Sequence, residues 1–254
     1  MVFAVDIGNT NIVIGCCRDN KIIFVERVST KADATVLEYA ISFKSILEFY
    51  GIVKEDIDGA IISSVVPSVT ATVHSAIEKV MDKDALVIGP GLKTGLNILI
   101  DNPAQLGSDL VVAAVATINE YPLPQIVIDM GTATTVSVID KNRNYLGGMI
   151  MPGVGISHDA LVSRTAQLPK VALEAPKKVI GRNTIDCIRN GILYGNAGTL
   201  DGIIDRIKAE IGECTVVATG GLAGVIVPLC KNEIIVDDDI MLKGLMQIYN
   251  RNHE

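Results

Sequence analysis

The stretch that decides the fold is Asp6-Ile7-Gly8-Asn9-Thr10-Asn11, which lies between an apolar run over residues 2–5 and a second one over 12–15. A tight turn of this composition between two strands can bind phosphate. The glycine lets the backbone approach an oxyanion, and the Asn and Thr side chains offer hydrogen-bond donors. An aspartate at the end of a buried strand can hold a metal–phosphate complex through its cation. The alternative for one such loop is an ordinary hairpin turn with an Asx cap.

The same pattern recurs at residues 126–138, where an apolar strand runs into Asp129-Met130-Gly131-Thr132 and then into a second apolar strand. Polar turns at 18–21 and 141–144 follow the two copies, and each leads to a further strand. Two copies about half a chain apart indicate a duplicated domain.

This duplication is similar to the actin, Hsp70 and sugar-kinase superfamily, in which two such hairpins face the phosphates of one ATP. We therefore expect an α/β protein made of two ribonuclease-H-like domains, residues 1–120 and 121–254. Each domain would be an actin-like ATPase half that offers its loop to an interdomain cleft. The Pro-rich junction at 121–124 is the expected boundary.

Composition excludes several classes of protein. The net charge of −7 argues against nucleic acid as a partner. No apolar run is long enough for a membrane span, and the N-terminus has no signal-peptide pattern, so we expect a cytoplasmic protein that does not bind membranes. The five cysteines show no C-x-x-C spacing, and the three histidines have no metal-ligand partner at helical spacing. We expect the cysteines to be buried free thiols.

Periodicity predicts the remaining elements. In the first half we expect three antiparallel strands over 2–28, helices over 35–50 and 69–82, and strands over 60–66 and 85–88. In the second half we expect a Gly-rich turn over 147–155, a helix over 155–164, a helical region over 181–211 that is kinked near 191–198, a strand over 215–218 and a helix over 239–250.

Asp109 is the best candidate for a catalytic base. It ends a long irregular segment over 92–107 and begins an apolar helix. Phosphoryl transfer needs a carboxylate that orients the acceptor hydroxyl and takes its proton. The helix macrodipole would favour the ionised carboxylate and depress its basicity. The alternative is a helix N-cap formed by Ser108 or Asp109.

Two further turns are candidate ligand contacts. Gly220-Gly221, between a strand and a helix, would let the backbone approach the adenosine end of a nucleotide. Asn183-Thr184 precedes a helix, where a plain N-cap and a ligand contact are both open.

With these residues in place, the chain resembles the type III pantothenate kinases, the family once described as Bvg accessory factor. The motifs run in consistent order from Asp6 to about Leu245. They are Asp-Ile-Gly-Asn-Thr at 6–10, Ser-Ser-Val-Val-Pro at 63–67, Gly-Pro-Gly-x-Lys-Thr-Gly-Leu-Asn at 89–97, Asp-x-Gly-Thr-Ala-Thr-Thr at 129–135, Gly-Gly-x-Ile-x-Pro-Gly at 147–153, Leu-Pro at 168–169, Gly-x-Asn-Thr at 181–184 and Thr-Gly-Gly-Leu-Ala at 219–223.

The resemblance implies a homodimer that phosphorylates pantothenate with ATP, the first step toward coenzyme A, with its active site at the dimer interface. Asp109 would be the proton acceptor, Asp129 would bind a monovalent cation (K⁺ or NH₄⁺), and Asp6 would act through Mg²⁺. The ATP contacts would be Asp6, Ile7, Gly8, Asn9, Thr10, Asn11, Ile12, Val13 and Thr132. The substrate contacts would be Ile100, Gly107, Ser108, Asp109, Leu110 and Thr184.

Two positions depart from the family pattern, and both fall in the substrate pocket. Leu110 stands where the family has an arginine that would pair with the pantothenate carboxylate, and Ile100 stands where an aromatic residue is expected. Losing one bidentate carboxylate contact costs about 1.5–3 kcal/mol, or about 10–150-fold in affinity. The alternatives are a kinase for a related hydroxyl compound, or a non-catalytic paralogue that acts as a regulator or pairs with an active paralogue.

Overall fold

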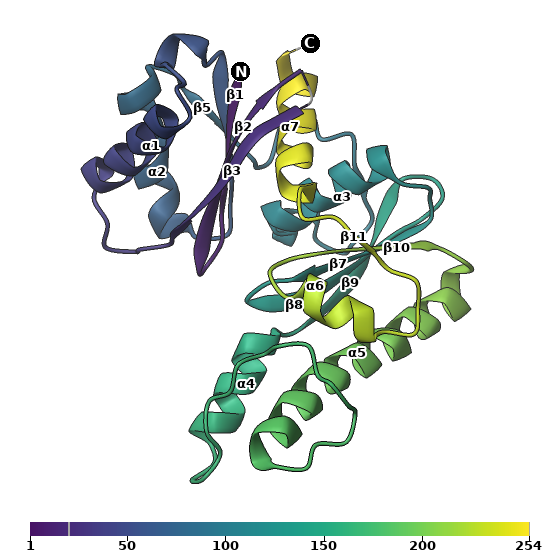
Figure 1. The fold of residues 1–254 in the computed structure, drawn as a ribbon. Helices are drawn as coiled ribbons and strands as arrows, with labels where there is room; N and C mark the ends of the chain where they lie inside the picture. The colour runs from purple at the N-terminus through teal and green to yellow at the C-terminus, as the bar shows by residue number, and fades with distance from the viewer. Residues whose placement is uncertain (20, 254) are drawn as a thin grey trace. The chain divides into compact units, whose positions relative to one another are not determined.

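Figure 1 shows the computed structural model, which describes residues 1–19 and 21–253. Asn20, in the polar turn expected at 18–21, lies outside the described residues. The chain forms two compact units. Unit 1 consists of residues 1–96, 102–119 and the chain from Asp239 onward, and unit 2 consists of residues 97–101 and 120–238. The C-terminal helix thus belongs to unit 1, whereas the sequence assigned residues 121–254 to the second half.

Unit 1 contains a five-stranded sheet in the order β3-β2-β1-β4-β5. The first three strands form antiparallel hairpins, and β4 and β5 join parallel to β1. The strands are β1 (Val2–Ile7), β2 (Asn11–Arg18), β3 (Lys21–Ser29), β4 (Gly59–Ser64) and β5 (Ala85–Val87). The helices are α1 (Val36–Phe49), η1 (Lys54–Asp56), α2 (Pro67–Met81), η2 (Pro103–Gln105), α3 (Ser108–Glu120) and α7 (Ile240–His253).

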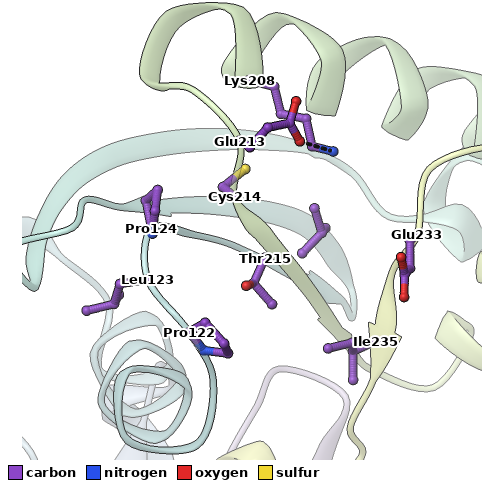
Figure 2. Close-up of a pocket in the computed structure, with 10 residues that line it drawn as sticks. Pro122, Leu123, Pro124, Lys208, Glu213, Cys214, Thr215, Glu233 and Ile235 are labelled. Carbon is purple, nitrogen blue, oxygen red and sulfur yellow. Dashed lines mark ion pairs between the residues drawn. The ribbon is translucent and has the colours of Figure 1, made fainter.

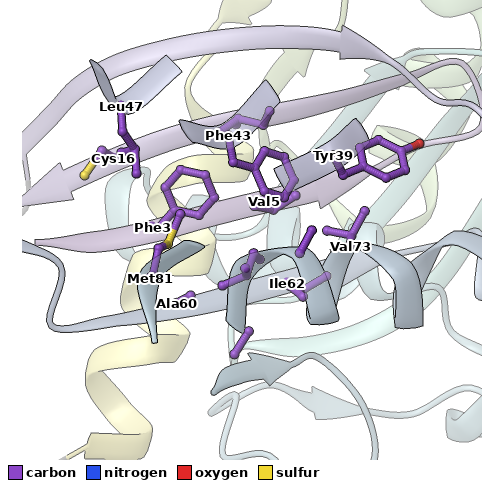
Figure 3. Close-up of a cluster of buried hydrophobic side chains, with 14 of the residues drawn as sticks. Phe3, Val5, Cys16, Tyr39, Phe43, Leu47, Ala60, Ile62, Val73 and Met81 are labelled. Carbon is purple, nitrogen blue, oxygen red and sulfur yellow. The ribbon is translucent and has the colours of Figure 1, made fainter. Parts of the chain in front are cut away.

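The sheet of unit 1 is covered on both faces. Phe3 and Val5 of β1 point into the core that α1 and α2 complete, where Phe43 packs edge-on against Phe3 (Figure 3). On the other face α7 packs against β1, β2 and β4. A Cβ at Gly15 would lie 2.5 Å from the Leu242 side chain, so glycine at this position allows the close approach of the helix.

Unit 2 contains a six-stranded sheet in the order β11-β10-β7-β8-β9-β6. Helices α4, α5 and α6 contribute to its hydrophobic core. The strands are β6 (Asn97–Ile98), β7 (Gln125–Met130), β8 (Ala133–Ile139), β9 (Asn144–Pro152), β10 (Thr215–Thr219) and β11 (Ile235–Val236). The helices are α4 (Val154–Ser163), α5 (Thr184–Ile211), α6 (Ala223–Ile226) and η3 (Val227–Leu229).

The two units repeat one topology, which confirms the predicted duplication. In each, an antiparallel three-stranded meander is extended by two parallel strands beside its first strand. Even the irregularities match. The register shifts after Cys16 in β2 and after Val138 in β8, and these residues lie opposite Phe3 and Ile126, each three positions before the loop aspartate.

Two expectations are wrong in detail. The segment expected to be a Gly-rich turn at 147–155 is mostly strand β9, because backbone pairing with β8 requires a residue without a side chain at Gly148. Helix α5 runs over 28 residues, and the kink expected near 191–198 stays a prediction. Cys16 and Cys17 are buried free thiols as expected, but Cys187 is exposed. Over the described chain, no helix is both long and apolar enough to cross a membrane.

Candidate functional site

The first loop is held by its own backbone and by the end of β3. The Gly8 N–H donates to the Asn11 carbonyl at 3.0 Å and closes the turn. Thr30 Oγ1 donates to the Gly8 carbonyl at 2.6 Å, and the Thr30 N–H donates to the Thr10 carbonyl at 3.0 Å. Asn9, Thr10 and Asn11 are exposed at the tip of the loop.

The apolar residues that flank this loop have a different role. The side chains of Ile7 and Ile12 are fully buried in the core of unit 1, and Val13 is half-buried on β2. Any contact that Ile7 or Ile12 makes with a nucleotide must therefore use the backbone. Their side chains anchor the hairpin that carries the polar turn.

The second loop is closed by the start of α4. The Gly153 N–H donates to the Thr132 carbonyl at 3.1 Å, and a Cβ at Gly153 would lie 2.1 Å from that oxygen. Only glycine lets the two segments approach this closely. Thr132 is exposed at the tip of the loop, and Asp129 is half-buried at the end of β7.

The two loop aspartates occupy equivalent positions in their units. Asp6 lies beside Ser63 in the parallel pairing of β1 with β4, and Asp129 lies beside Thr219 in the pairing of β7 with β10. Both carboxylates are half-buried. Each unit therefore places a half-buried carboxylate beside a buried hydroxyl residue at the carboxyl ends of adjacent parallel strands, where α/β proteins bind ligands.

Asp109 lies in the first turn of α3. Its Oδ1 accepts the Leu110 N–H at 2.8 Å. Burial raises the pKa of this carboxyl above its ordinary value, although backbone N–H groups oppose the shift. The expected depression of its basicity is therefore wrong in direction, because the loss of water outweighs the favourable backbone dipoles. A Cβ at Gly107 would lie 2.5 Å from Asp109 Oδ1, so glycine there leaves room for the carboxylate.

Ser108 ties the start of α3 to the end of β4. Its Oγ accepts hydrogen bonds from the Ser64 N–H at 3.0 Å and from Ser63 Oγ at 3.1 Å, and it donates to the Ser64 carbonyl at 2.8 Å. These bonds use the hydroxyl proton and both lone pairs. A substrate contact by Ser108 would therefore use its backbone, and the side chain serves to fix the helix that carries Asp109.

Ser63 and Ser64, which complete this serine cluster, were not predicted as part of the site. Ser63 is fully buried, and Ser64 Oγ accepts hydrogen bonds from the Val66 N–H at 3.1 Å and from Thr70 Oγ1 at 2.7 Å. The available signal was a pair of hydroxyl residues that ends an apolar strand, at the carboxyl end that also carries Asp6.

The remaining predicted substrate contacts are divided between the units. Leu110 is half-buried in unit 1, and Ile100 is half-buried in unit 2 near Gly147. Thr184 is exposed at the start of α5, where Asn183 Oδ1 accepts the Asp186 N–H at 2.9 Å. The N-cap interpretation therefore holds for Asn183 and leaves the Thr184 side chain available to a ligand.

Thr184 lines a cavity of about 510 Å³ in unit 2. Leu161 of α4 and Leu168 form an apolar part of its wall, while Arg182 adds a positive charge. A cavity of this size and mixed lining suits a small polar molecule with a short apolar chain.

Figure 2 shows a second cavity, of about 500 Å³, around Pro124 and Thr215. Lys208 and Glu213 pair across its rim at 3.2 Å. It lies where β7 and β10 begin, whereas Asp129 and Thr219 lie where these strands end. It is therefore separate from the candidate site.

The donor set fits a cation that is shared with a bound phosphate. Among the described residues no three His, Cys, Asp or Glu side chains form a ready metal cage. Mg²⁺ is commonly bound by one or two carboxylates together with substrate phosphates, and this arrangement needs no cage of protein ligands. Asp6 and Asp129 each offer such a carboxylate beside a hydroxyl.

Comparisons with known proteins identify the family of this chain. A family model described as type III pantothenate kinase matches residues 2–206. A type III pantothenate kinase from Brevibacillus brevis is 46% identical over 99% of both chains. One from Halalkalibacterium halodurans is 42% identical over 99% of this chain and all of the relative.

Solved structures agree on the fold. A Campylobacter jejuni protein described as a putative Baf family transcriptional activator has a TM-score of 0.60 at 19% identity, over 99% of this chain and 98% of that one. Component A of (R)-2-hydroxyglutaryl-CoA dehydratase from Acidaminococcus fermentans has a TM-score of 0.58 at 18% identity, over 100% and 99%. The match to the family model and the identity with full-length relatives show that this chain belongs to the type III pantothenate kinase family.

Proposed function

We propose that this chain transfers the γ-phosphoryl group of ATP to the primary hydroxyl of pantothenate, the first step toward coenzyme A. Its family and full-length relatives support this reaction. The observation that carries the proposal is Asp109, a carboxylate with a raised pKa on a helix that Ser108 ties to the strand beside Asp6.

In this mechanism Asp109 accepts the proton of the pantothenate hydroxyl as the hydroxyl oxygen attacks the γ-phosphorus. The raised pKa makes Asp109 a stronger base than an exposed aspartate. A loose transition state transfers the proton late, so holding the hydroxyl in line with the phosphate contributes more than base strength.

Each polar loop is a candidate for nucleotide binding. In the first loop the side chains of Asn9, Thr10 and Asn11 would contact phosphate oxygens, and in the second loop Thr132 would do so. Asp6 would hold Mg²⁺ together with the phosphates, and Asp129 would hold K⁺ or NH₄⁺. Bound there, these cations would neutralise negative charge on the phosphates.

Leu110 and Ile100 replace the arginine and the aromatic residue that the family has in its acceptor pocket. Without the family's arginine, the pantothenate carboxylate needs another partner or stays solvated. Leu110→Arg should lower KM for pantothenate by about 10-fold or more, since a bidentate pair contributes about 1.5–3 kcal/mol. An unchanged KM with faster turnover of a related alcohol without the carboxylate would favour the altered-substrate alternative.

The proposed assembly is a homodimer with its active site at the interface, working in the cytoplasm where ATP is available. The resemblance to the family suggests this assembly, and Ile150 (77% exposed) and Ile180 (81% exposed) on unit 2 are apolar side chains that an interface could cover. Light scattering of the purified protein tests this: a monomeric mass at assay concentration would contradict it. A dimer formed only with an active paralogue would favour the heteromeric alternative.

The role of Asp109 is tested by Asp109→Asn. The amide keeps the shape and the acceptor for the Leu110 N–H but cannot take a proton, so kcat should fall by about 10²–10⁴-fold while ATP binding persists. Asp84→Asn, at an exposed carboxylate of the same unit that pairs with His74, is the matched control and should retain full turnover. Full turnover by Asp109→Asn would contradict the mechanism.

A further inference from the structure

Residues 165–183 connect α4 to α5 without forming a helix or strand. This segment nevertheless covers part of the core of unit 2. Val171 is 9% exposed, and Leu168 and Leu173 pack on the same cluster. Leu168 also lines the 510 Å³ cavity that contains Thr184, so the position of the segment determines the shape of that cavity.

A buried histidine holds the middle of this segment. His158 on α4 is 3% exposed, and its Nε2 accepts the Val171 N–H at 3.2 Å. A neutral imidazole that accepts at Nε2 carries its proton on Nδ1. A buried backbone N–H must keep a partner, so removing this acceptor leaves an unsatisfied donor that can be relieved only if the segment moves toward water.

The neighbouring tethers are of a different kind. Lys170 and Asp159 form an exposed ion pair at 2.8 Å between the same two segments, and Arg189 Nε donates to the Ala172 carbonyl at 2.9 Å. An exposed ion pair contributes little, because both charges are well solvated without each other. The bond from Val171 to His158 is the buried one.

We propose that His158 is a positioning residue for the acceptor substrate: by holding Val171, it fixes the wall of the cavity that contains Thr184. The assignment of this cavity to pantothenate rests on the proposed function. A wall that is fixed in both the ground state and the transition state affects KM and leaves kcat unchanged. His158 lies five residues beyond Gly153, whose N–H holds the second ATP loop at Thr132, and the first ATP loop is in unit 1. Both loops keep their own bonds in a His158 variant, so KM for ATP should not respond.

The test compares His158→Leu, which fills the space without an acceptor, with His158→Gln, whose amide oxygen can replace Nε2. His158→Leu should raise KM for pantothenate by about tenfold or more, with kcat and KM for ATP within about twofold of the parent. His158→Gln should restore KM to within about threefold. Lys170→Ala, which removes the exposed ion pair between the same segments, is the matched control and should behave as the parent.

Hydrogen–deuterium exchange provides a readout that does not depend on turnover. Residues 165–183 should exchange faster in His158→Leu and at the parental rate in His158→Gln. Unchanged exchange together with an unchanged KM for pantothenate in His158→Leu would overturn the proposal. A lower kcat accompanied by equal increases in KM for pantothenate and for ATP would also overturn it. A wild-type protein that leaves pantothenate unmodified would refute the proposed function and the acceptor assignment, while exchange would still decide whether His158 holds the segment.

Discussion

The hydroxyl of Ser108 and the backbone of Ser64 exchange two hydrogen bonds, one accepted by Oγ at 3.0 Å and one donated by it at 2.8 Å. This pair joins the first residue of α3 to the last residue of β4. Asp109 follows Ser108 in the chain, and Asp6 lies beside Ser63 in the sheet. The two carboxylates of unit 1 that the mechanism uses are thus connected through a fixed serine cluster.

Ser108→Ala should lower kcat/KM about tenfold and the free energy of unfolding by about 1–3 kcal/mol, because the Ser64 N–H and the Ser63 hydroxyl each lose a partner. Ser42→Ala is the control, since Ser42 is half-buried in the same unit and its hydroxyl donates to the Glu38 carbonyl of its own helix. Steady-state kinetics and urea unfolding measure the two effects. Parental kcat/KM in a destabilised Ser108→Ala would show that the cluster stabilises the fold without positioning Asp109.

Asp109 should make the protein less stable at neutral pH. Its pKa is raised in the folded state, so the native carboxyl holds a proton more tightly than the unfolded chain does. Stability is then lost as pH rises from the ordinary aspartate pKa through the raised one. Asp109→Asn should therefore unfold at higher urea concentration than the parent at pH 7, and the difference should shrink toward about pH 4. A variant less stable than the parent at pH 7 would contradict the raised pKa.

Two glycine-to-alanine changes in unit 2 should have opposite effects. At Gly148 a Cβ would lie 1.9 Å from the Val136 carbonyl oxygen, so Gly148→Ala should destabilise by at least about 1–3 kcal/mol by forcing β9 from β8. At Gly198, inside α5, a Cβ would meet no atom within 4 Å, so Gly198→Ala should stabilise by about 0.5–1 kcal/mol. Thermal unfolding measures the stability of both variants relative to the parent protein. A change of the same sign in the two variants would contradict the packing described.

The duplicated hairpins could be predicted from the sequence because strand, aspartate, glycine and strand are local patterns that recur. The same patterns predicted that Asp6 and Asp129 end buried strands. A strand was predicted after the turn at 141–144, but its continuation through 147–152 was predicted as a Gly-rich turn. Its Gly148 is required by the close approach of β8, which no local rule reports. The return of α7 to unit 1 likewise depends on its packing against β1, β2 and β4.

In the site, too, local sequence patterns did not report what depends on the folded chain. Position at a helix start predicted a depressed pKa for Asp109, but its degree of burial comes from the folded chain and reverses the sign. In the sequence, Ser108 lies about 45 positions after the adjacent pair Ser63 and Ser64, and nothing local connects them. Their convergence, like the bond between His158 and Val171, exists only in three dimensions.

The central claim is tested most directly by incubating the purified protein alone with ATP, pantothenate, Mg²⁺ and K⁺ while following ADP release and product mass. We expect ADP formation that depends on pantothenate, and a product heavier by one phosphoryl group. We also expect that Asp109→Asn abolishes nearly all of this product. ATP binding without any phosphorylated pantothenate, at substrate levels that saturate related kinases, would contradict the claim.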